Sequence, residues 1–234
     1  MCSRGYKRLF RIDLGRTDYR ETWELQKRLV MLRRQSRVPD MLLFTEHEPV
    51  ITMGRGTDRD NLLVTEAQLK HKGVNLYEIE RGGDITFHGP GQTVIYPIVD
   101  LNNRGRDLHQ YLRDLENLII LTLHDFGLDA GVKKGLTGVW VDESKVAAIG
   151  VAVSRWVTYH GAALNVATDL DYFRLINPCG ITEYPVGSIK NLLRRNSSLE
   201  EVNDRLAENF ASLFYYELER VKELESILME TTQV

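Results

Sequence analysis

The amino-acid sequence predicts an α/β protein of the α+β type, in which helices flank a mixed, mainly antiparallel sheet. The chain has 234 residues and no Ser-, Pro- or Gly-rich linker, so one domain over residues 1–234 with one substantial core is expected. Short β-rich segments bounded by turn residues recur along the sequence. Longer segments with helical spacing of apolar residues stand between them. This mixture favours helices packed around a sheet.

The N-terminal half is expected to contain one long helix and several strands. Residues 9–14 are typical of a strand. Asp18 followed by Glu21 matches a capping box, and the helix that begins there runs to about Arg37 and ends before Pro39. The remaining elements of this half are predicted strands at 41–46, 50–53, 75–79 and 93–100 and a short helix at 65–71.

The C-terminal half is expected to contain two long helices and a β-hairpin. The first helix fits residues 108–126 and ends before Gly127. Strands are predicted at 138–141, 146–153 and 156–166, the first two forming a hairpin around Asp142-Glu143-Ser144-Lys145. The last helix begins at Ser198, and its apolar stripe is predicted to consist of Leu199, Val202, Leu206, Phe210, Leu213 and Leu218.

Composition favours a cytoplasmic protein. The apolar runs are far shorter than a bilayer span, and the first residues lack the apolar core of a signal peptide. Cys2 and Cys179 are too far apart in the sequence to suggest a disulfide framework, so free thiols in a reducing compartment are expected. Neither a membrane nor a nucleic acid is expected as a partner.

The net charge of -3 hides two basic clusters. Both lack the interleaved aromatic residues of nucleic-acid platforms. Solvated helix faces are one interpretation, and docking of an acidic protein is the other. The early cluster is Lys27, Arg28, Arg33, Arg34 and Arg37, and the late cluster is Lys190, Arg194 and Arg195.

The segment from Arg81 to Gln92 is the most informative part of the sequence. It contains Gly82, Gly83, Gly89 and Gly91 within an otherwise strand-like region. Glycine allows positive φ and close approach of the backbone to a ligand, so a substrate-binding groove is one interpretation. A turn-rich hairpin with a stray histidine is the alternative.

Cys179 is a candidate nucleophile. It lies between Pro178 and Gly180, where little bulk surrounds the sulfur. A thiol with a pKa of about 8.5 needs a neighbouring cation or base to be reactive at neutral pH. Lys145, His88 and His160 could each serve. Taken singly, however, a cysteine is more often a buried apolar group, and a lysine in a hairpin is more often solvated.

Other chemistries receive weak support. Neither the histidines nor the cysteines show metal-ligand spacing, so no metal is expected. Gly54-Arg55-Gly56 could hold a phosphate but lacks the rest of a P-loop. The segment 158–165, which contains His160, could form the far wall of the same groove or be an edge strand.

Taken together, these segments resemble the lipoyl(octanoyl) transferase family. The resemblance covers most of the chain, in the order of the family's motifs. The matching segments are Leu14-Gly15, Asp18-Tyr19, 46–55, 81–92, 138–141, 145–150, 160–166 and Pro178-Cys179-Gly180-Ile181. No departure from the family pattern is found at these positions; Phe87 and Asp84 are tolerable variants. The family's fold is similar to that of biotin and lipoate protein ligases.

The resemblance implies specific roles for residues of this chain. Cys179 would carry an octanoyl thioester, and Lys145 would lower the pKa of its thiol. The acyl pocket would be lined by Arg81, Gly82, Gly83, Asp84, Ile85, Thr86, Phe87, His88, Ala148, Ile149, Gly150, His160, Gly161, Ala162 and Ala163. The donor would be octanoyl-acyl carrier protein and the acceptor a lysine of a lipoyl domain of a 2-oxoacid dehydrogenase or of glycine cleavage H protein, without any cofactor.

Two alternatives stay open at this stage. An ATP-dependent lipoate or biotin protein ligase would share the fold, but it would not need a nucleophilic cysteine. A non-catalytic module that binds carrier proteins would keep the groove, but it would not need both Lys145 and Cys179.

Overall fold

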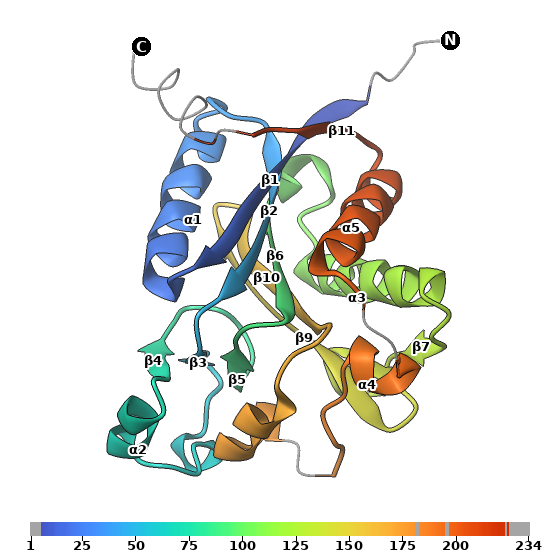
Figure 1. The fold of residues 1–234 in the computed structure, drawn as a ribbon. Helices are drawn as coiled ribbons and strands as arrows, with labels where there is room; N and C mark the ends of the chain where they lie inside the picture. Colours follow the sequence, from blue (N-terminus) through green and yellow to red (C-terminus); the bar gives the residue numbers. More distant parts are fainter. Residues whose placement is uncertain (1–5, 181–182, 195–196, 223, 225–234) are drawn as a thin grey trace.

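The computed structural model describes residues 6–180, 183–194, 197–222 and 224. Eight strands form the main sheet: β1 (Lys7–Thr17), β2 (Asp40–His47), β6 (Gln92–Ile98), β7 (Ala130–Gly131), β8 (Val139–Val141), β9 (Ser144–Ser154), β10 (Val157–Asn165) and β11 (Tyr216–Arg220). Their order across the sheet is β11-β1-β2-β6-β10-β9-β8-β7 (Figure 1). Strand β1 is parallel to both of its neighbours, and the other pairs are antiparallel. The predicted mixed, mainly antiparallel sheet is therefore confirmed.

A second sheet of three strands lies at one end of the first (Figure 1). Its strands are β3 (Val50–Met53), β4 (Asn75–Glu78) and β5 (Ile85–His88), in the order β4-β3-β5. The short helix α2 (Glu66–His71) accompanies this sheet and begins with a capping box between Thr65 and Gln68. The predicted segments 75–79 and 65–71 are confirmed as a strand and a helix.

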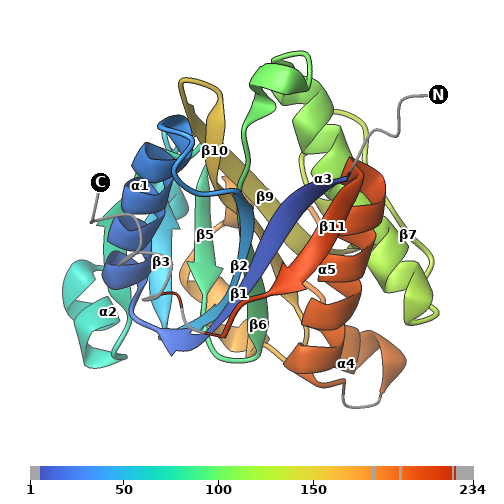
Figure 2. The same cartoon turned by 90° about the horizontal axis from the view of Figure 1, so that it is seen from above.

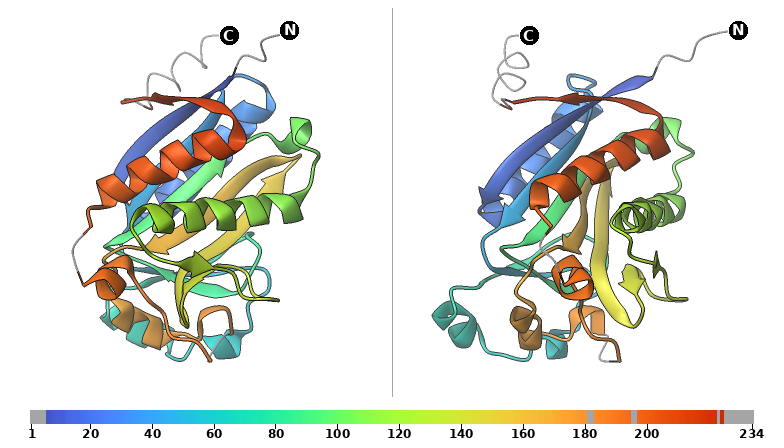
Figure 3. Two further views of the ribbon diagram at one scale, coloured as in Figure 1. Left: turned by 90° about the vertical axis from the view of Figure 1, so that its right-hand side faces the viewer. Right: turned by 45° about the vertical axis from the view of Figure 1, so that its right-hand side comes forward.

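Helices cover both faces of the main sheet. Helix α1 (Tyr19–Arg34) lies on one face, whereas α3 (Leu108–Asp125) and α5 (Leu199–Phe214) lie on the other (Figures 2 and 3). The remaining helical segments are α4 (Ile189–Leu193) and the 3-10 turns η1 (Arg59–Asn61), η2 (Leu101–Asn103), η3 (Leu170–Leu175) and η4 (Pro178–Gly180). In the part of the chain that the structure describes, no helix has the length and apolar character needed to cross a membrane.

Each helix layer buries its own apolar core against the sheet. On the α1 side, Leu29 and Leu32 pack with Met41 of β2. On the opposite side, Leu118 of α3 and Phe210 of α5 pack with strand residues that include Phe44. Burying one such side chain contributes about 1.5–3 kcal/mol. The two cores fix the main sheet, which carries one wall of the site described below.

Two sequence expectations are corrected by the structure. Leu218 continues the helical spacing of the last helix, but it lies in β11 because Tyr215 adopts a left-handed conformation (φ 57°) and ends α5. Segment 81–92 is not a hairpin, since Ile85–His88 forms β5, which pairs with β3 of the small sheet, whereas β6 belongs to the main sheet. The apolar and polar residues of β5 alternate as in a strand, but the strand has only four residues and glycines lie close to both of its ends, which hides this alternation in the sequence.

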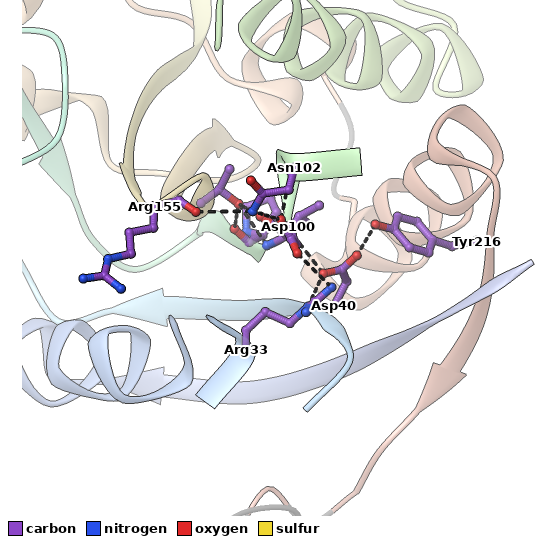
Figure 4. Close-up of polar contacts among 9 residues, drawn as sticks. Arg33, Asp40, Asp100, Asn102, Arg155 and Tyr216 are labelled. Atoms are coloured by element: carbon purple, nitrogen blue, oxygen red, sulfur yellow. Dashed lines mark hydrogen bonds and ion pairs between the residues drawn. The ribbon is translucent and has the colours of Figure 1, made fainter. Parts of the chain in front are cut away.

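A buried carboxylate connects β11 to the rest of the fold (Figure 4). Asp40 is 3% exposed at the start of β2, and it accepts hydrogen bonds from Arg33 Nε (2.6 Å) and from the hydroxyl of Tyr216. Arg33 also lies 3.6 Å from a carboxylate oxygen of Asp100, which in turn accepts from Asn102. A buried charge is tolerated only when it is paired in this way. The network therefore joins α1, β2 and the C-terminal strand.

Candidate active site

Lys145 is buried although it follows a hairpin turn. The turn is confined to Asp142 and Glu143, so Lys145 is the second residue of β9 and is only 6% exposed. Its backbone bonds to segment 185–187, through Pro185 O and Gly187 N, and its ammonium lies 5.2 Å from the centre of the Trp140 ring. The interpretation of Lys145 as a solvated turn residue is therefore wrong.

Gly138 makes room for this lysine. A Cβ atom at Gly138 would lie 2.7 Å from Lys145 Cε and 2.7 Å from the carbonyl oxygen of Ala147. Gly138 also has φ 138°, and its N–H donates to the buried carboxylate of Glu116 on α3 (3.1 Å). Any larger residue here would displace the lysine side chain.

The backbone that carries Cys179 forms the 3-10 turn η4, and its side chain lies outside the described part of the chain. Turn η4 packs against β5 and η1. Asn61 of η1 donates to Asp84 (2.7 Å), and both side chains lie 3.4 Å from the position of a Cβ on Gly180. The loop before β5 and the turn of the predicted nucleophile are thus neighbours.

Lys145 and Pro178 line one recess. This small cavity of about 300 Å³ is bounded by residues of β5, β6, β9, β10 and the turns that follow them. Its lining residues are Thr86, Gln92, Lys145, Ala147, Ala148, Ala163, Asn165, Phe173, Pro178 and Val186. The structure therefore brings the predicted lysine and the turn of the predicted cysteine to the same place.

A second, mostly apolar cavity of about 440 Å³ adjoins this recess, and the two share Thr86, Ala148 and Ala163. We name this cavity the long pocket. It is lined by Tyr19, Arg81, Gly83, Asp84, Thr86, His88, Val94, Tyr96, Ala148, Ile149, Gly150, His160, Gly161, Ala162 and Ala163. Twelve of the fifteen residues predicted to bind the acyl group are among them. The long pocket thus brings together three segments that are distant in the sequence, 81–88, 148–150 and 160–163. Their role in binding stays a prediction.

The three other predicted residues do not line the long pocket. Strand β5 alternates, so Thr86 and His88 face the cavity, whereas Ile85 and Phe87 belong to a separate core beneath it. Phe87 stacks on Tyr172 at 4.7 Å between ring centres. Gly82 contributes its backbone, donating to Val151 O of β9 (2.9 Å).

Arg81 holds the two sides of the long pocket together. Its guanidinium donates to the carbonyl of Gly82 and to the carbonyl and hydroxyl oxygens of Thr52, and the residue is 7% exposed. Gly150 of β9 is needed for this, since a Cβ there would lie 2.9 Å from Arg81 Cδ. The arginine therefore ties the small sheet to the wall of the main sheet.

Segment 158–165 is an interior strand. Strand β10 pairs with β9 on one side and β6 on the other, and all of its residues are buried. The alternative of an edge strand is wrong. Two of the four glycines of segment 81–92, Gly83 and Gly91, adopt positive φ (84° and 80°).

Three buried histidines surround the long pocket. His88 Nδ1 lies 2.8 Å from Gln92 Oε1, while Gln92 Nε2 donates to Asn165 and to the Phe87 carbonyl. Because the amide orientation is fixed by these two acceptors, Nδ1 of His88 carries the proton. Burial lowers the pKa of His88 to about 3, with smaller contributions from the nearby His47 and Arg81.

The other two buried histidines are also neutral. Burial lowers the pKa of His47 to about 4, and its Nε2 lies 2.8 Å from the Tyr96 hydroxyl. Burial, together with the charges of Arg81 and Lys27, lowers the pKa of His160 to about 3. Neither His88 nor His160 lines the recess that contains Lys145. Of the three candidates, Lys145 alone lines the recess that Pro178 also lines.

These histidines predict that the protein loses stability in mild acid. In the unfolded chain each takes up a proton near pH 6.5, while the folded forms stay neutral down to about pH 4, so unfolding binds protons within this window. As the pH is lowered through this window, the free energy of unfolding should decrease by about 1.4 kcal/mol per pH unit for each of these histidines. Urea denaturation at pH 6.5, 5.75 and 5.0 measures this slope.

A variant pair isolates the effect. His47→Gln should lower the slope of unfolding free energy against pH by about 1.4 kcal/mol per pH unit, because one proton fewer is taken up on unfolding. The exposed His109, on α3, provides the control, and His109→Gln should leave the slope unchanged. Equal slopes in the two variants would show that the buried histidines do not titrate as inferred.

Gly54-Arg55-Gly56 is packed against Arg81 and Gly83. The N–H of Arg55 donates to Arg81 O (3.0 Å), and that of Gly56 donates to Gly83 O (3.0 Å). These amides are already engaged, so the segment offers little to a phosphate.

The early basic cluster is partly used within the protein. Arg33 serves the Asp40 network, and Lys27 lies 3.7 Å from the centre of the Trp23 ring. Lys190 and Arg194 are exposed at α4, and Arg195 lies outside the described residues. Docking of an acidic partner on either cluster stays a prediction.

Several lining residues were not assigned to the site from the sequence. Val94 and Tyr96 alternate with Ile95 along β6, so period-two counting from the known core could have placed both on the same face. Tyr19 lines the long pocket from the buried side of α1, and Gln26, buried on the same helix, accepts from the N–H of His160. A glutamine within an apolar helical stripe is the sequence signal that could have identified Gln26.

Comparisons with known proteins identify the family of the chain. Residues 18–211 match the family model described as lipoyl protein ligase A/B catalytic domain. An octanoyltransferase of Solibacter usitatus is 50% identical over 206 residues, covering 88% of this chain and 93% of the relative. An octanoyltransferase of Desulforamulus reducens is 42% identical over 213 residues, covering 91% and 93%.

Solved structures confirm the fold. A lipoate-protein ligase A bound with ATP has a TM-score of 0.73 at 17% identity, covering 97% of this chain and 93% of that one. A biotin protein ligase from Aquifex aeolicus has a TM-score of 0.54 at 13% identity, covering 90% and 71%. On the strength of the family match and of the relatives at 42–50% identity, the chain belongs to the octanoyltransferases of the lipoyl protein ligase A/B catalytic domain family, which are acyltransferases.

Proposed function

We propose that this protein transfers an octanoyl group from octanoyl-acyl carrier protein, through a thioester on Cys179, to a lysine of a lipoyl domain. One observation supports this most directly: buried Lys145 and Pro178, the residue before Cys179, line the same recess. The curated relatives named octanoyltransferase point to the same acyl group. The reaction would be the attachment step of protein lipoylation.

The long pocket suits an unbranched acyl chain. The wall from β9 and β10 consists of small residues, Ala148, Gly150, Gly161, Ala162 and Ala163. Such residues leave room for methylene groups, and each buried methylene stabilises binding by about 0.8 kcal/mol. The pocket begins at the Lys145 recess, so the thioester end of the chain would lie there.

In the first half of the reaction, the Cys179 thiolate would attack the thioester carbonyl of the donor. A bond forms between Sγ and the carbonyl carbon, and the bond from that carbon to the phosphopantetheine sulfur breaks. The departing sulfur takes up a proton. The Lys145 ammonium would stabilise the thiolate beforehand and could deliver this proton.

In the second half, the ε-amine of the acceptor lysine would attack the acyl-enzyme. An amide bond forms, the carbon–sulfur bond to Cys179 breaks and releases the thiolate, and the proton that the amine loses would go to the neutral amine of Lys145, which restores its ammonium. No ATP is required for this exchange, because a thioester is converted into a more stable amide. The acceptors would be lipoyl domains of 2-oxoacid dehydrogenases and glycine cleavage H protein.

This proposal predicts turnover without nucleotide or metal. Purified protein, octanoyl-acyl carrier protein and an apo lipoyl domain should yield octanoylated lipoyl domain at an undiminished rate in EDTA with ATP omitted. Intact-mass analysis of the acceptor measures the product. Free octanoate in place of the thioester donor is the control and should give none. Strict dependence on ATP would instead assign the protein to the ligases.

A further inference from the structure

His160 has an unusual backbone conformation in the middle of a strand. Its φ is 54°, the left-handed region that a non-glycine residue occupies only at a cost, although its neighbours in β10 pair regularly with β9. Gln26 of α1 holds it there, because the His160 N–H donates to Gln26 Oε1 at 2.7 Å. Gln26 is fully buried and His160 is 1% exposed. Helix α1 and strand β10 therefore hold the His160 imidazole in place together.

The side-chain nitrogens of this pair lack protein partners. Within the described part of the chain, Nδ1 and Nε2 of His160 and Nε2 of Gln26 are buried without a hydrogen bond. A neutral imidazole has one donor and one acceptor, and buried groups of this kind are normally satisfied by protein or by ordered water. The corner around His160 is therefore polar within a mostly apolar pocket.

This polar corner lies away from the reacting end of the pocket. His160 lines the long pocket together with Tyr19, His88 and Tyr96, none of which lines the Lys145 recess. The Tyr96 ring meets His160 edge-on at 6.4 Å between ring centres. Its hydroxyl is engaged by His47, whose Nδ1 faces the Thr17 carbonyl. An acyl chain that starts at Lys145 would reach these residues with its methyl end.

We infer that His160, positioned by Gln26, sets the acyl chain length by holding a water molecule at the far end of the long pocket. The inference rests on the proposed function, since it assumes an acyl chain in this pocket. A chain of the right length stops against the water. A longer alkyl chain must expel the water and leaves the imidazole without a hydrogen bond, which opposes binding.

Two substrates of equal length test this in the unmodified protein. The nonanoyl and ω-hydroxyoctanoyl groups differ only in the last heavy atom, which is a methyl carbon in one and a hydroxyl oxygen in the other. The hydroxyl can replace the water at His160, so kcat/KM for the ω-hydroxyoctanoyl thioester should exceed that of the nonanoyl thioester by about tenfold. A preference for nonanoyl, or no preference, would overturn the inference.

Two variants separate polarity from volume. His160→Phe keeps a ring but removes its nitrogens, and it should raise the dodecanoyl-to-octanoyl ratio of kcat/KM by about tenfold. His160→Asn is shorter but polar and tolerates positive φ, and it should leave that ratio within about twofold. His109→Phe, at an exposed position of α3, is the control. The inference would be contradicted if the dodecanoyl-to-octanoyl ratio rose only in His160→Asn, or rose equally in both variants. It would also be contradicted if the ratio did not rise in His160→Phe.

The readout also separates this inference from the proposed function. All chain-length assays use N-acetylcysteamine thioesters with apo lipoyl domain as acceptor, and thermal melts confirm that each variant is folded. Absence of octanoyl transfer from octanoyl-acyl carrier protein by the unmodified protein would refute the proposed function itself. Octanoyl transfer with the wrong chain-length pattern would refute only the role of His160, and the two-substrate comparison decides even if His160→Phe does not fold.

Discussion

Cys179→Ala should abolish acyl transfer. If Cys179 is the nucleophile, its removal eliminates the covalent route, and losses of roughly 10⁴-fold or more follow when enzymes lose a nucleophile. Transfer from octanoyl-acyl carrier protein to an apo lipoyl domain measures the effect. The fold should be unaffected, because η4 is held by backbone bonds such as Gly180 N to Asn177 O (3.0 Å).

The covalent intermediate provides a second measurement. Incubation with donor alone should add the mass of one octanoyl group, and hydroxylamine should remove it. Peptide mapping should place the adduct on Cys179. Cys2, which lies outside the described residues, provides the matched control: Cys2→Ala should retain both the adduct and the activity. Full activity in Cys179→Ala, or an adduct on Cys2, would refute the proposal.

Lys145→Met should slow acylation by roughly 10²- to 10³-fold at neutral pH, a typical cost of losing a proton-transfer group. Methionine is similar in volume and fits beside Gly138 and Trp140, but it carries no charge. The Cys179 thiol should then ionise at higher pH, so part of the activity should return in alkaline buffer. The rate of octanoyl adduct formation, measured from pH 6 to 10, gives the result.

Alkylation of Cys179 distinguishes this role from general damage. In Lys145→Met, the pH profile of the iodoacetamide reaction should move upward, whereas a merely disturbed pocket would change the rate without moving the profile. Lys134→Met removes an exposed lysine from the preceding loop and should leave the profile unchanged. If the Lys145 and Lys134 variants titrate alike, Lys145 does not activate the thiol.

Sequence periodicity predicted α1, α2, α3, α5 and most strands, because apolar spacing and caps are local signals, whereas the short α4 was not predicted. It placed α1 correctly from Asp18, whose side chain accepts from the N–H groups of Arg20 and Glu21. It failed at Leu218, because a single left-handed residue, Tyr215, changes helix to strand without altering the spacing of apolar residues.

The site was predictable only in part. The motifs gathered segments 81–88, 148–150 and 160–163, but burial of Lys145 depends on Gly138 and on segment 185–187, which contact it from elsewhere in the fold. The polar corner was missed for the same reason. The bond from His160 N to Gln26 joins residues far apart in the sequence, and no local pattern reports such a contact.

The parallel pairing of β1 with β11 affects how the chain can fold during synthesis. Lys7 lies opposite Tyr216, so one edge of the first described strand waits for almost the whole chain to leave the ribosome. At 5–20 residues per second, that edge stays uncovered for roughly ten to forty seconds. A strand edge without a partner can pair with another chain. Nascent chains should therefore be most prone to aggregate until β11 emerges and Tyr216 reaches Asp40.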